Sequence, residues 1–268
     1  MGERLMSNFY HYVISAKNAE DRRASILSNF QTHGIEPQFF EAILGNALSK
    51  EQLRVLDVDA GLMSLGEMGC ALSHLAIYKK MLDSQKPYVF VFEDDAYLTN
   101  DFFHDLPDLK KFMDTHTEPM VLLLYKAIAH TKLVVAKDNK PFILRALGGS
   151  CAHGYVINRK AAENILRLQN PPKIEIDAWA QYMKLNLLNI YCMEEMLVKL
   201  NELHAKDSLI ETIDSREMKD SKYLKMMRKQ WLQQFYNHLS LDEKLLIQGK
   251  RFWRHIQEFY YDKETPAK

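Results

Sequence analysis

The stretch Tyr88-Val-Phe-Val-Phe-Glu-Asp-Asp-Ala-Tyr-Leu-Thr99 decides how this chain folds. Its apolar half, residues 88–92, follows Lys86-Pro87 and stops abruptly at three consecutive acids, residues 93–95. A short β-branched and aromatic run of this kind is typical of a buried central strand. Because ligands of open α/β sheets bind at the carboxyl ends of the strands, the three acids stand where a site is expected.

Three neighbouring carboxylates repel one another unless a cation or a hydrogen-bonding ligand joins them. Oxygen ligands of this type suit Mg²⁺ or Mn²⁺, and these ions in turn suit a diphosphate. The segment therefore predicts a metal-assisted enzyme that acts on a nucleotide or a phosphate. The alternative interpretation is a solvated acidic turn that only ends the strand.

The residues before this strand predict a parallel arrangement. Phe9–Ser15 is rich in aromatic and β-branched residues, as a strand is, and Phe39–Ile43 predicts a second strand. Between them, residues 19–31 predict a helix with Asn18 as its N-cap. Such a β-α-β unit implies parallel strands joined by a crossover helix.

The rest of the chain continues the α/β pattern. Ser64-Leu-Gly-Glu67 has the form of a capping box and predicts a helix that runs to about Ser84. The other expected elements are strands at 120–125, 151–157 and 190–193, a hairpin of 133–136 with 142–146, and helices at 160–168 and 177–187.

From Ser221 onwards the sequence predicts two basic and aromatic helices. The first carries a stripe of Leu224, Met227, Trp231 and Phe235 beside Lys222, Lys225, Arg228 and Lys229, and the second has Phe252, Trp253, Ile256, Phe259 and Tyr260 after Lys250 and Arg251. Residues 216–268 contain 12 Lys and Arg against 7 Asp and Glu. Two interpretations are compatible with this pattern: helices that pack on the domain, and a face that rests on a membrane of anionic lipids.

The composition excludes several classes of protein. A formal net charge of zero gives no argument for a nucleic-acid partner. The three cysteines, Cys70, Cys151 and Cys192, are odd in number and widely spaced, so we expect neither a disulfide framework nor a zinc ribbon, and a reducing compartment fits best. We expect no signal peptide and no transmembrane helix.

Four segments, in this order, resemble a single family. They are Val13-Ile-Ser-Ala-Lys-Asn-Ala-Glu-Asp-Arg-Arg23, Leu65-Gly-Glu-Met-Gly-Cys-Ala-Leu-Ser-His74, Val91-Phe-Glu-Asp-Asp95 and His153-Gly-Tyr-Val-Ile-Asn158. The chain is similar to glycosyltransferase family 25, the lipopolysaccharide and lipooligosaccharide galactosyltransferase type, which is related to collagen galactosyltransferases. The resemblance covers roughly residues 9–215. It implies a GT-A-type, Rossmann-like sheet flanked by helices in residues 1–215, followed by a helical C-terminal extension in residues 216–268.

The resemblance also implies an activity. It is the transfer of a sugar, most often galactose, from UDP-galactose to a saccharide hydroxyl with inversion, assisted by Mn²⁺ or Mg²⁺. The implied partners are a UDP-sugar donor, a lipooligosaccharide or oligosaccharide acceptor and an anionic membrane surface, with the protein in the cytoplasm at the inner-membrane face. The competing hypothesis is a non-catalytic UDP-sugar-binding or glycan-binding module docked on a membrane. The sequence leaves open the hexose, the acceptor, the linkage and the oligomeric state.

Within this family pattern, Asp95 is the expected metal ligand. Glu93 lies two residues earlier on the same strand face, so it would contact the metal or the ribose. Asp94 points to the other face if the strand continues that far. His204 is a candidate second metal ligand from the C-terminal side.

Several polar residues are candidate contacts for the donor. Arg22 and Arg23 could reach a phosphate or the uracil, or could form salt bridges on the helix surface. Glu67 and His74 share one helical face, although Glu67 could act only as a cap and His74 only as a buried core residue. The other candidates are Ser15 at the end of the first strand, Ser73 beside His74, and His153 before the Gly-Tyr strand.

An inverting transfer needs one base that takes the proton of the acceptor hydroxyl. Asp177, in Ile174-Glu-Ile-Asp-Ala-Trp179, is the leading candidate and Glu175 the second. Asp177 would equally suit the N-cap of the following helix. Trp179 could stack on an acceptor sugar or be buried, and Cys70 is expected to be a small buried residue rather than a nucleophile.

Overall fold

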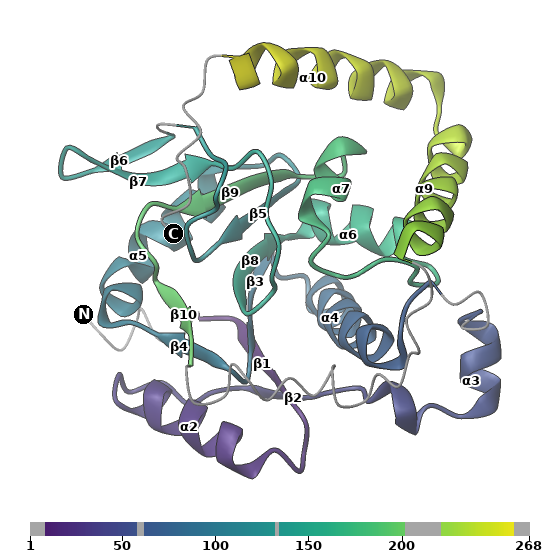
Figure 1. The fold of residues 1–268 in the computed structure, drawn as a ribbon. Coiled ribbons are helices and arrows are strands. Elements are labelled where there is room, and N and C mark those ends of the chain that lie inside the picture. Colours follow the sequence, from purple (N-terminus) through teal and green to yellow (C-terminus); the bar gives the residue numbers. More distant parts are fainter. Residues whose placement is uncertain (1–8, 58–61, 132–133, 202–220, 260–268) are drawn as a thin grey trace.

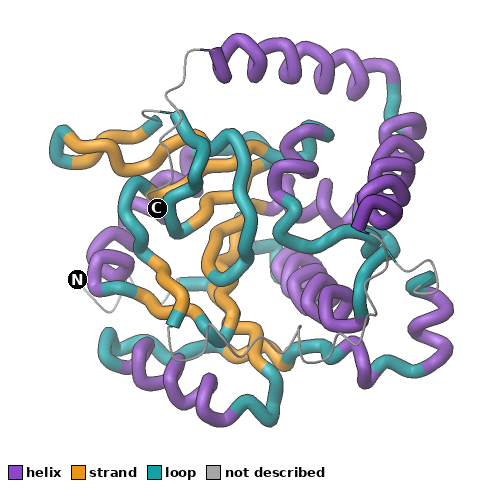
Figure 2. The backbone as a smooth tube through the Cα atoms, viewed as in Figure 1, coloured by secondary structure: helices purple, strands orange, loops and turns teal. Residues whose placement is uncertain are grey.

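The computed structural model describes residues 9–57, 62–131, 134–201 and 221–259, and within the last range the side chains of residues 223–254. A large sheet runs through the middle of the molecule, and helices cover both of its faces (Figure 1, Figure 2). The predicted α/β class with flanking helices and a helical C-terminal part is confirmed.

The main sheet has eight strands in the order β2-β1-β3-β8-β5-β9-β7-β6. Two of them, β8 and β7, run against the others, so the carboxyl ends of β1, β3, β5 and β9 meet at one edge. The strands are β1 His11–Ser15, β2 Phe39–Glu41, β3 Tyr88–Glu93, β5 Met120–Leu123, β6 Val135–Lys137, β7 Lys140–Arg145, β8 Gly154–Asn158 and β9 Asn189–Met193.

A second, two-stranded sheet follows the acids directly. In it β4 (Ala96–Leu98) pairs antiparallel with β10 (Val198–Leu200). The backbone N–H of Asn201, just after β10, donates to the carbonyl oxygen of Asp95 at an N···O distance of 2.7 Å. The C-terminal half of the domain therefore returns to the end of β3.

Helices cover both faces of the main sheet, so its central strand β3 is buried on both sides. Val89 and Val91 belong to the core under α4 and α6, and Phe90 and Phe92 to the core under α2 and α5. This alternation is what a strand with side-chain period two requires when both faces are covered. The helices are α2 Glu20–Gln31, α3 Lys50–Val55, α4 Leu65–Asp83, α5 Asn100–Thr115, α6 Arg159–Leu168, α7 Trp179–Lys184, α9 Ser221–His238 and α10 Leu241–Phe259, with a 3₁₀ turn η1 at Gly45–Ala47.

Local sequence signals place most of these elements correctly. The Ser64 and Glu67 capping box forms in both directions at the start of α4. The predicted hairpin is β6–β7, and its turn residues Asp138 and Asn139 have φ of 51° and 60°, as a tight two-residue turn needs. The prediction of Asn18 as N-cap is wrong, because α2 begins after Ala19 and has no side-chain cap.

The two C-terminal helices differ in how they meet the domain. Trp231, Leu232 and Phe235 of α9 pack against the core, as the packing interpretation predicts. Helix α10 then crosses above α7 (Figure 1) and buries only Ile247 among its large apolar residues with described side chains. The predicted boundary between residues 215 and 216 lies outside the described residues. In the described part of the chain, no helix is both long and apolar enough to cross a membrane.

Buried His11 in β1 makes the stability of the fold depend on pH. Its Nδ1–H donates to the Phe9 carbonyl at 2.9 Å, while its Nε2 accepts from the Gln38 N–H at 3.2 Å. The neutral ring fits this pair of partners, and burial lowers the pKa of His11 to about 4. Because this pKa lies below the unfolded value of 6.5, the unfolded chain takes up a proton first, and stability present above pH 6.5 is lost as the pH falls towards 4.

We expect the free energy of unfolding to fall by about 2 kcal/mol between pH 7.5 and pH 5 through His11 alone. Urea titrations of His11→Gln, which keeps an amide donor and acceptor, should lack this part of the pH dependence. The matched control is His104→Gln, at a histidine whose side chain is 75% exposed. An equal pH dependence in the wild type and His11→Gln would contradict the assignment.

Candidate active site

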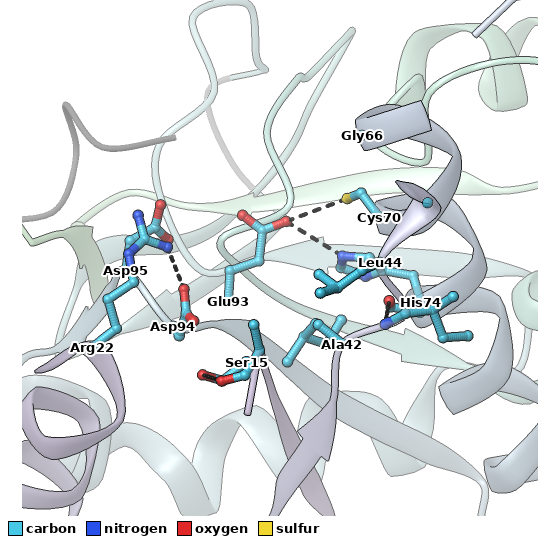
Figure 3. A pocket seen from close by; sticks show the side chains of 15 residues that line it. Ser15, Arg22, Ala42, Leu44, Gly66, Cys70, His74, Glu93, Asp94 and Asp95 are labelled. Carbon is cyan, nitrogen blue, oxygen red and sulfur yellow. Dashed lines mark hydrogen bonds and ion pairs between the residues drawn. The ribbon is translucent and has the colours of Figure 1, made fainter. Parts of the chain in front are cut away.

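A cavity of about 130 Å³ lies at the carboxyl ends of β1 and β3, against the first turns of α4 (Figure 3). Among the predicted site residues, seven line it: Ser15, Arg22, Ser73, His74, Glu93, Asp94 and Asp95. Ligand pockets are usually about 300–1,000 Å³. A nucleotide-sugar would therefore extend beyond this cavity, with only part of the molecule inside it.

Glu93 is held by the helix that the capping box begins. Its Oε1 lies 3.3 Å from Nε2 of fully buried His74 and 4.0 Å from Sγ of Cys70 (Figure 3). The other ring nitrogen, Nδ1 of His74, is 2.7 Å from the Tyr155 hydroxyl, which is 2.7 Å from the Tyr78 hydroxyl. Every partner is satisfied when Tyr78 donates to Tyr155, Tyr155 to Nδ1, and the Nε2–H to Glu93. Burial would raise the pKa of Glu93, but the hydrogen bond from His74, together with the electrostatic effects of His74, His153 and Arg22, outweighs burial and lowers the pKa.

The other two acids have different surroundings. Asp94 forms a buried ion pair with Arg22 of α2 (Figure 3), so the salt-bridge interpretation holds for Arg22, although its partner is a residue of the cavity rather than of the helix surface. The Oδ1 of Asp95 is buried and has no hydrogen bond among the described residues, although the charge of Arg22 acts on this carboxyl as well. Burial, together with the charge of Glu93, raises the pKa of Asp95 to about 7.

These surroundings fit the predicted divalent cation. A buried carboxylate oxygen without a donor is costly unless a cation neutralises it, and Asp95 presents one beside Glu93. A second group could also hold a metal, because ligand atoms of Cys70, His74 and Glu93 all lie within 4.8 Å of one another. Cys70 is partly buried and lines the cavity, rather than being fully buried as expected. Burial raises the pKa of its thiol, which agrees with a residue that is not a nucleophile. His204, the other predicted ligand, lies outside the described residues.

Close backbone contacts hold α4 against the end of β2. A Cβ on Gly69 would lie 2.4 Å from the Ile43 carbonyl, and one on Gly45 would lie 1.8 Å from the Leu65 carbonyl. Ser73 bridges the same gap, since its Oγ donates to the Gly69 carbonyl and accepts from the Ile43 N–H, both at 2.8 Å. Its hydroxyl therefore has a structural role at the cavity wall.

Two further predicted contacts, Arg23 of α2 and Ser15 at the end of β1, are hydrogen-bonded to each other. Arg23 donates to Oγ and to the carbonyl oxygen of Ser15 at 3.3 Å, lies 3.5 Å from Glu41, and stacks over Phe39. Arg23 does not line the cavity, so the surface salt bridge describes it better than a donor contact. Ser15 does line the cavity.

Arg228 of α9 joins two of the predicted acids. It forms an ion pair with Glu175 and lies 3.8 Å from Glu67, and its guanidinium also donates to the Leu62 carbonyl at 2.7 and 3.0 Å. Glu67 itself accepts from the Ser64 N–H at 2.7 Å, as a cap does. Neither acid lines the cavity.

Asp177 holds the loop that precedes β8. Its Oδ2 accepts from the N–H of Cys151, which has φ of 72°, at 2.7 Å. The expectation that it caps the next helix is wrong, because Ala178 occupies that position. Trp179 donates its indole N–H to the Cys151 carbonyl and is 0% exposed, so the alternative in which it stacks on an acceptor sugar is also wrong.

His153 lies between this loop and the acids. Its backbone carbonyl accepts from the Glu93 N–H at 3.1 Å, and its ring stacks on Tyr125. Burial lowers the pKa of the His153 ring, and Nδ1 has no hydrogen-bond partner among the described residues. It does not line the cavity but contacts the strand that carries the acids.

Sequence reasoning missed three contributors to the site. Tyr78 and Tyr155 orient His74, and Arg228 neutralises Glu175. Tyr78 is four residues after His74 on the same helical face, and this spacing could have indicated a shared partner. No local signal could have paired Arg228 with Glu175, which is 53 residues away.

Clustered acids at the carboxyl end of a central strand, beside a cavity, place this protein among α/β proteins with a ligand site at the sheet edge. Residues 9–180 match the family model described as glycosyltransferase family 25 (LPS biosynthesis protein). The chain belongs to glycosyltransferase family 25.

Several characterised proteins are similar to this chain. The lacto-N-neotetraose biosynthesis glycosyltransferase LgtE of Neisseria meningitidis serogroup B is 32% identical over 160 residues, which cover 56% of this chain and 57% of that protein. The lipooligosaccharide biosynthesis protein lic2B of Haemophilus influenzae is 25% identical, covering 83% of this chain and 87% of that protein. Human procollagen galactosyltransferase 2 is 25% identical, covering 58% of this chain and 27% of that protein.

The chain thus spans only about half the length of LgtE, with 57% of that protein matched. Among solved structures, a putative glucose-1-phosphate thymidylyltransferase from Bacillus anthracis covers 81% of this chain and 82% of that one, with 13% identity and a TM-score of 0.39. That likeness is too distant to add anything about the site.

The close approach at Gly69 can be tested directly. Gly69→Ala should lower the free energy of unfolding by about 2 kcal/mol, because the new methyl group would push α4 away from the Ile43 carbonyl. The control is Gly249→Ala in α10, where nothing lies within 4 Å of the added Cβ and a neutral or slightly stabilising effect is expected. Urea unfolding of both variants gives the comparison, and equal stabilities would contradict the packing argument.

Proposed function

We propose that this protein is an inverting glycosyltransferase of the GT-A type that moves galactose from UDP-galactose to a saccharide acceptor in lipooligosaccharide biosynthesis. Family membership supports sugar transfer, the similarity to procollagen galactosyltransferase 2 supports galactose, and the similarity to lic2B supports the lipooligosaccharide pathway. The observation that carries the proposal is the buried, unpartnered Oδ1 of Asp95 beside Glu93 at the end of β3.

Asp95 and Glu93 would hold Mn²⁺ or Mg²⁺. The bound ion would supply neutralisation of the charge that develops on the leaving diphosphate. Glu93 is suited to a ligand's role because His74 orients its carboxylate and keeps it ionised. Arg22 stands at the cavity wall with its charge balanced by Asp94, so this pair shapes the pocket without adding net charge to it.

Asp177 is better suited than Glu175 to act as the general base. Glu175 is neutralised by Arg228, and a carboxylate paired with a guanidinium is a poor proton acceptor. Asp177 uses only Oδ2, on the Cys151 N–H, which leaves Oδ1 without a hydrogen bond among the described residues. Its charge also raises the pKa of Cys70, after the effects of burial and of Glu93, which supports a position near the cavity.

A location in the cytoplasm at the inner-membrane face is part of the same proposal. Lipooligosaccharide carries a lipid, so a transferase that extends it would meet its acceptor at a membrane surface. The interpretation as a non-catalytic binding module differs in one measurable respect, because such a protein would bind a UDP-sugar without releasing UDP.

The donor and metal assignments can be tested together. We expect UDP-galactose with Mn²⁺ to raise the melting temperature and to release UDP slowly, and UDP-glucose and the N-acetylated sugars to have smaller effects. Asp95→Asn should lower UDP release at least about a hundredfold, because the buried oxygen would no longer balance a cation.

The matched control is Asp83→Asn, an exposed carboxylate at the other end of α4, which should retain full activity. Retained activity in Asp95→Asn would refute the metal assignment. A thermal shift with no turnover for any donor or acceptor would support the non-catalytic module instead.

The base can be assigned by comparing two variants. Asp177→Asn should lower kcat by about 10²- to 10⁴-fold with little change in the KM for the donor, since the amide cannot accept the proton. Glu175→Gln should lower kcat less than tenfold. Melting temperatures separate loss of chemistry from loss of the Cys151 or Arg228 contacts. The reverse order of kcat values would assign the base to Glu175.

A further inference from the structure

Helix α10 has the reverse of the usual orientation of a surface helix. A surface helix normally puts its apolar face on the core, but α10 exposes its large apolar side chains. Leu241, Leu245 and Phe252 lie along one outward line and Leu246 and Trp253 along the next, all with 57–79% of their surface exposed. In contrast, α9 packs Trp231, Leu232 and Phe235 inward, although its Tyr223 and Met226 are also about half exposed.

The inner side of α10 is cationic. A cavity of about 580 Å³ lies between α10, α9 and α7, and four basic residues line it: Lys184, Lys229, Arg251 and Arg254. None of its lining residues is acidic. Lys184, Lys229 and Arg251 form no ion pair with any described residue, while Arg254 donates to the Met183 carbonyl at 2.7 Å. A concentration of positive charge without carboxylates attracts anions, and phosphate groups above all.

The position of α10 is nevertheless fixed. Ile247 is buried, Arg167 forms an ion pair with Glu243 at 2.9 Å, and Arg254 ties the helix to the end of α7. The helix therefore presents its apolar side chains outward and its cations on the side of the cavity.

We propose that α10 is an interfacial helix that lies in the surface of an anionic phospholipid bilayer. Its outward face would enter the boundary of the acyl chains, and the cations on its other side would then stand at the depth of the lipid phosphates. Trp253 and Phe252 agree with this environment, since aromatic side chains are enriched at membrane interfaces. A second copy of the chain docked through the apolar face would supply no anions to the cations on the other side of α10, whereas the headgroups of an anionic bilayer would, so the bilayer is the better partner.

This inference deepens the membrane part of the proposed function, but it does not depend on the identity of the donor. We would measure flotation of the full chain with vesicles of phosphatidylcholine alone and of phosphatidylcholine with phosphatidylglycerol. We expect binding only to the anionic vesicles, falling as salt is raised.

Two variants separate the apolar and the cationic contributions. Leu245→Glu with Phe252→Glu should weaken vesicle binding roughly tenfold or more by removing apolar contact and adding negative charge. The double substitution Lys229→Gln with Arg251→Gln should weaken vesicle binding about thirtyfold, because each cation near an anionic membrane surface contributes about 1 kcal/mol. The controls are Val55→Glu, at an exposed apolar residue of α3, and Lys50→Gln with Lys140→Gln, at exposed cations elsewhere. Point variants are preferable to deletion of residues 216–268, because deletion would also remove Arg228 from Glu175.

Unchanged binding in both α10 variants would overturn the proposal. So would a dimer in solution that the Leu245→Glu, Phe252→Glu variant dissociates, since the face would then be an interface between copies. UDP release from the soluble donor is measured on the same samples and should be unaffected. Loss of vesicle binding with normal turnover supports the membrane surface, whereas absent turnover in the wild type counts only against the enzymatic proposal.

Discussion

The site depends on one constraint, which is that three adjacent carboxylates must be accommodated at the end of a buried strand. Each of the three acids has different surroundings in the structure. Glu93 accepts a hydrogen bond from His74, Asp94 pairs with Arg22, and Asp95 has a buried oxygen without a partner. Two of the acids thus have partners within the protein, and Asp95 leaves room for a cation.

Meeting this constraint brings distant parts of the chain together. His74 reaches Glu93 only because α4 lies directly on the backbone at Ile43, which the absence of a side chain at Gly69 permits. Tyr155, on β8, then fixes the orientation of the His74 ring. The C-terminal helices take part as well, since Arg228 reaches Glu175 and Glu67, so α9 is a structural element of the catalytic domain.

Sequence reasoning succeeded where the physical signal is local. The buried strand at residues 88–92, the capping box at Ser64 and the β6–β7 hairpin depend on neighbours a few residues away, and all three are confirmed. The hairpin turn is two residues, Asp138 and Asn139, where residues 138–141 were expected. Sequence reasoning failed where a polar side chain could form hydrogen bonds with more than one partner. Asn18 was expected to be an N-cap, and for Asp177 an N-cap was the alternative to a general base. Neither residue caps a helix, and Asp177 accepts from the backbone N–H of Cys151 instead.

The α/β class, the central acidic strand and the family motifs follow from the sequence alone, because the hydrophobic period, helix capping and turn chemistry each depend on a short stretch of residues. Only the tertiary structure decided which acid is paired and which is left for a ligand, since those partners come from other elements. It also decided which way α10 faces. The sequence shows that this helix is amphipathic, but the packing of Ile247 and the ion pair of Glu243 turn its apolar side outward.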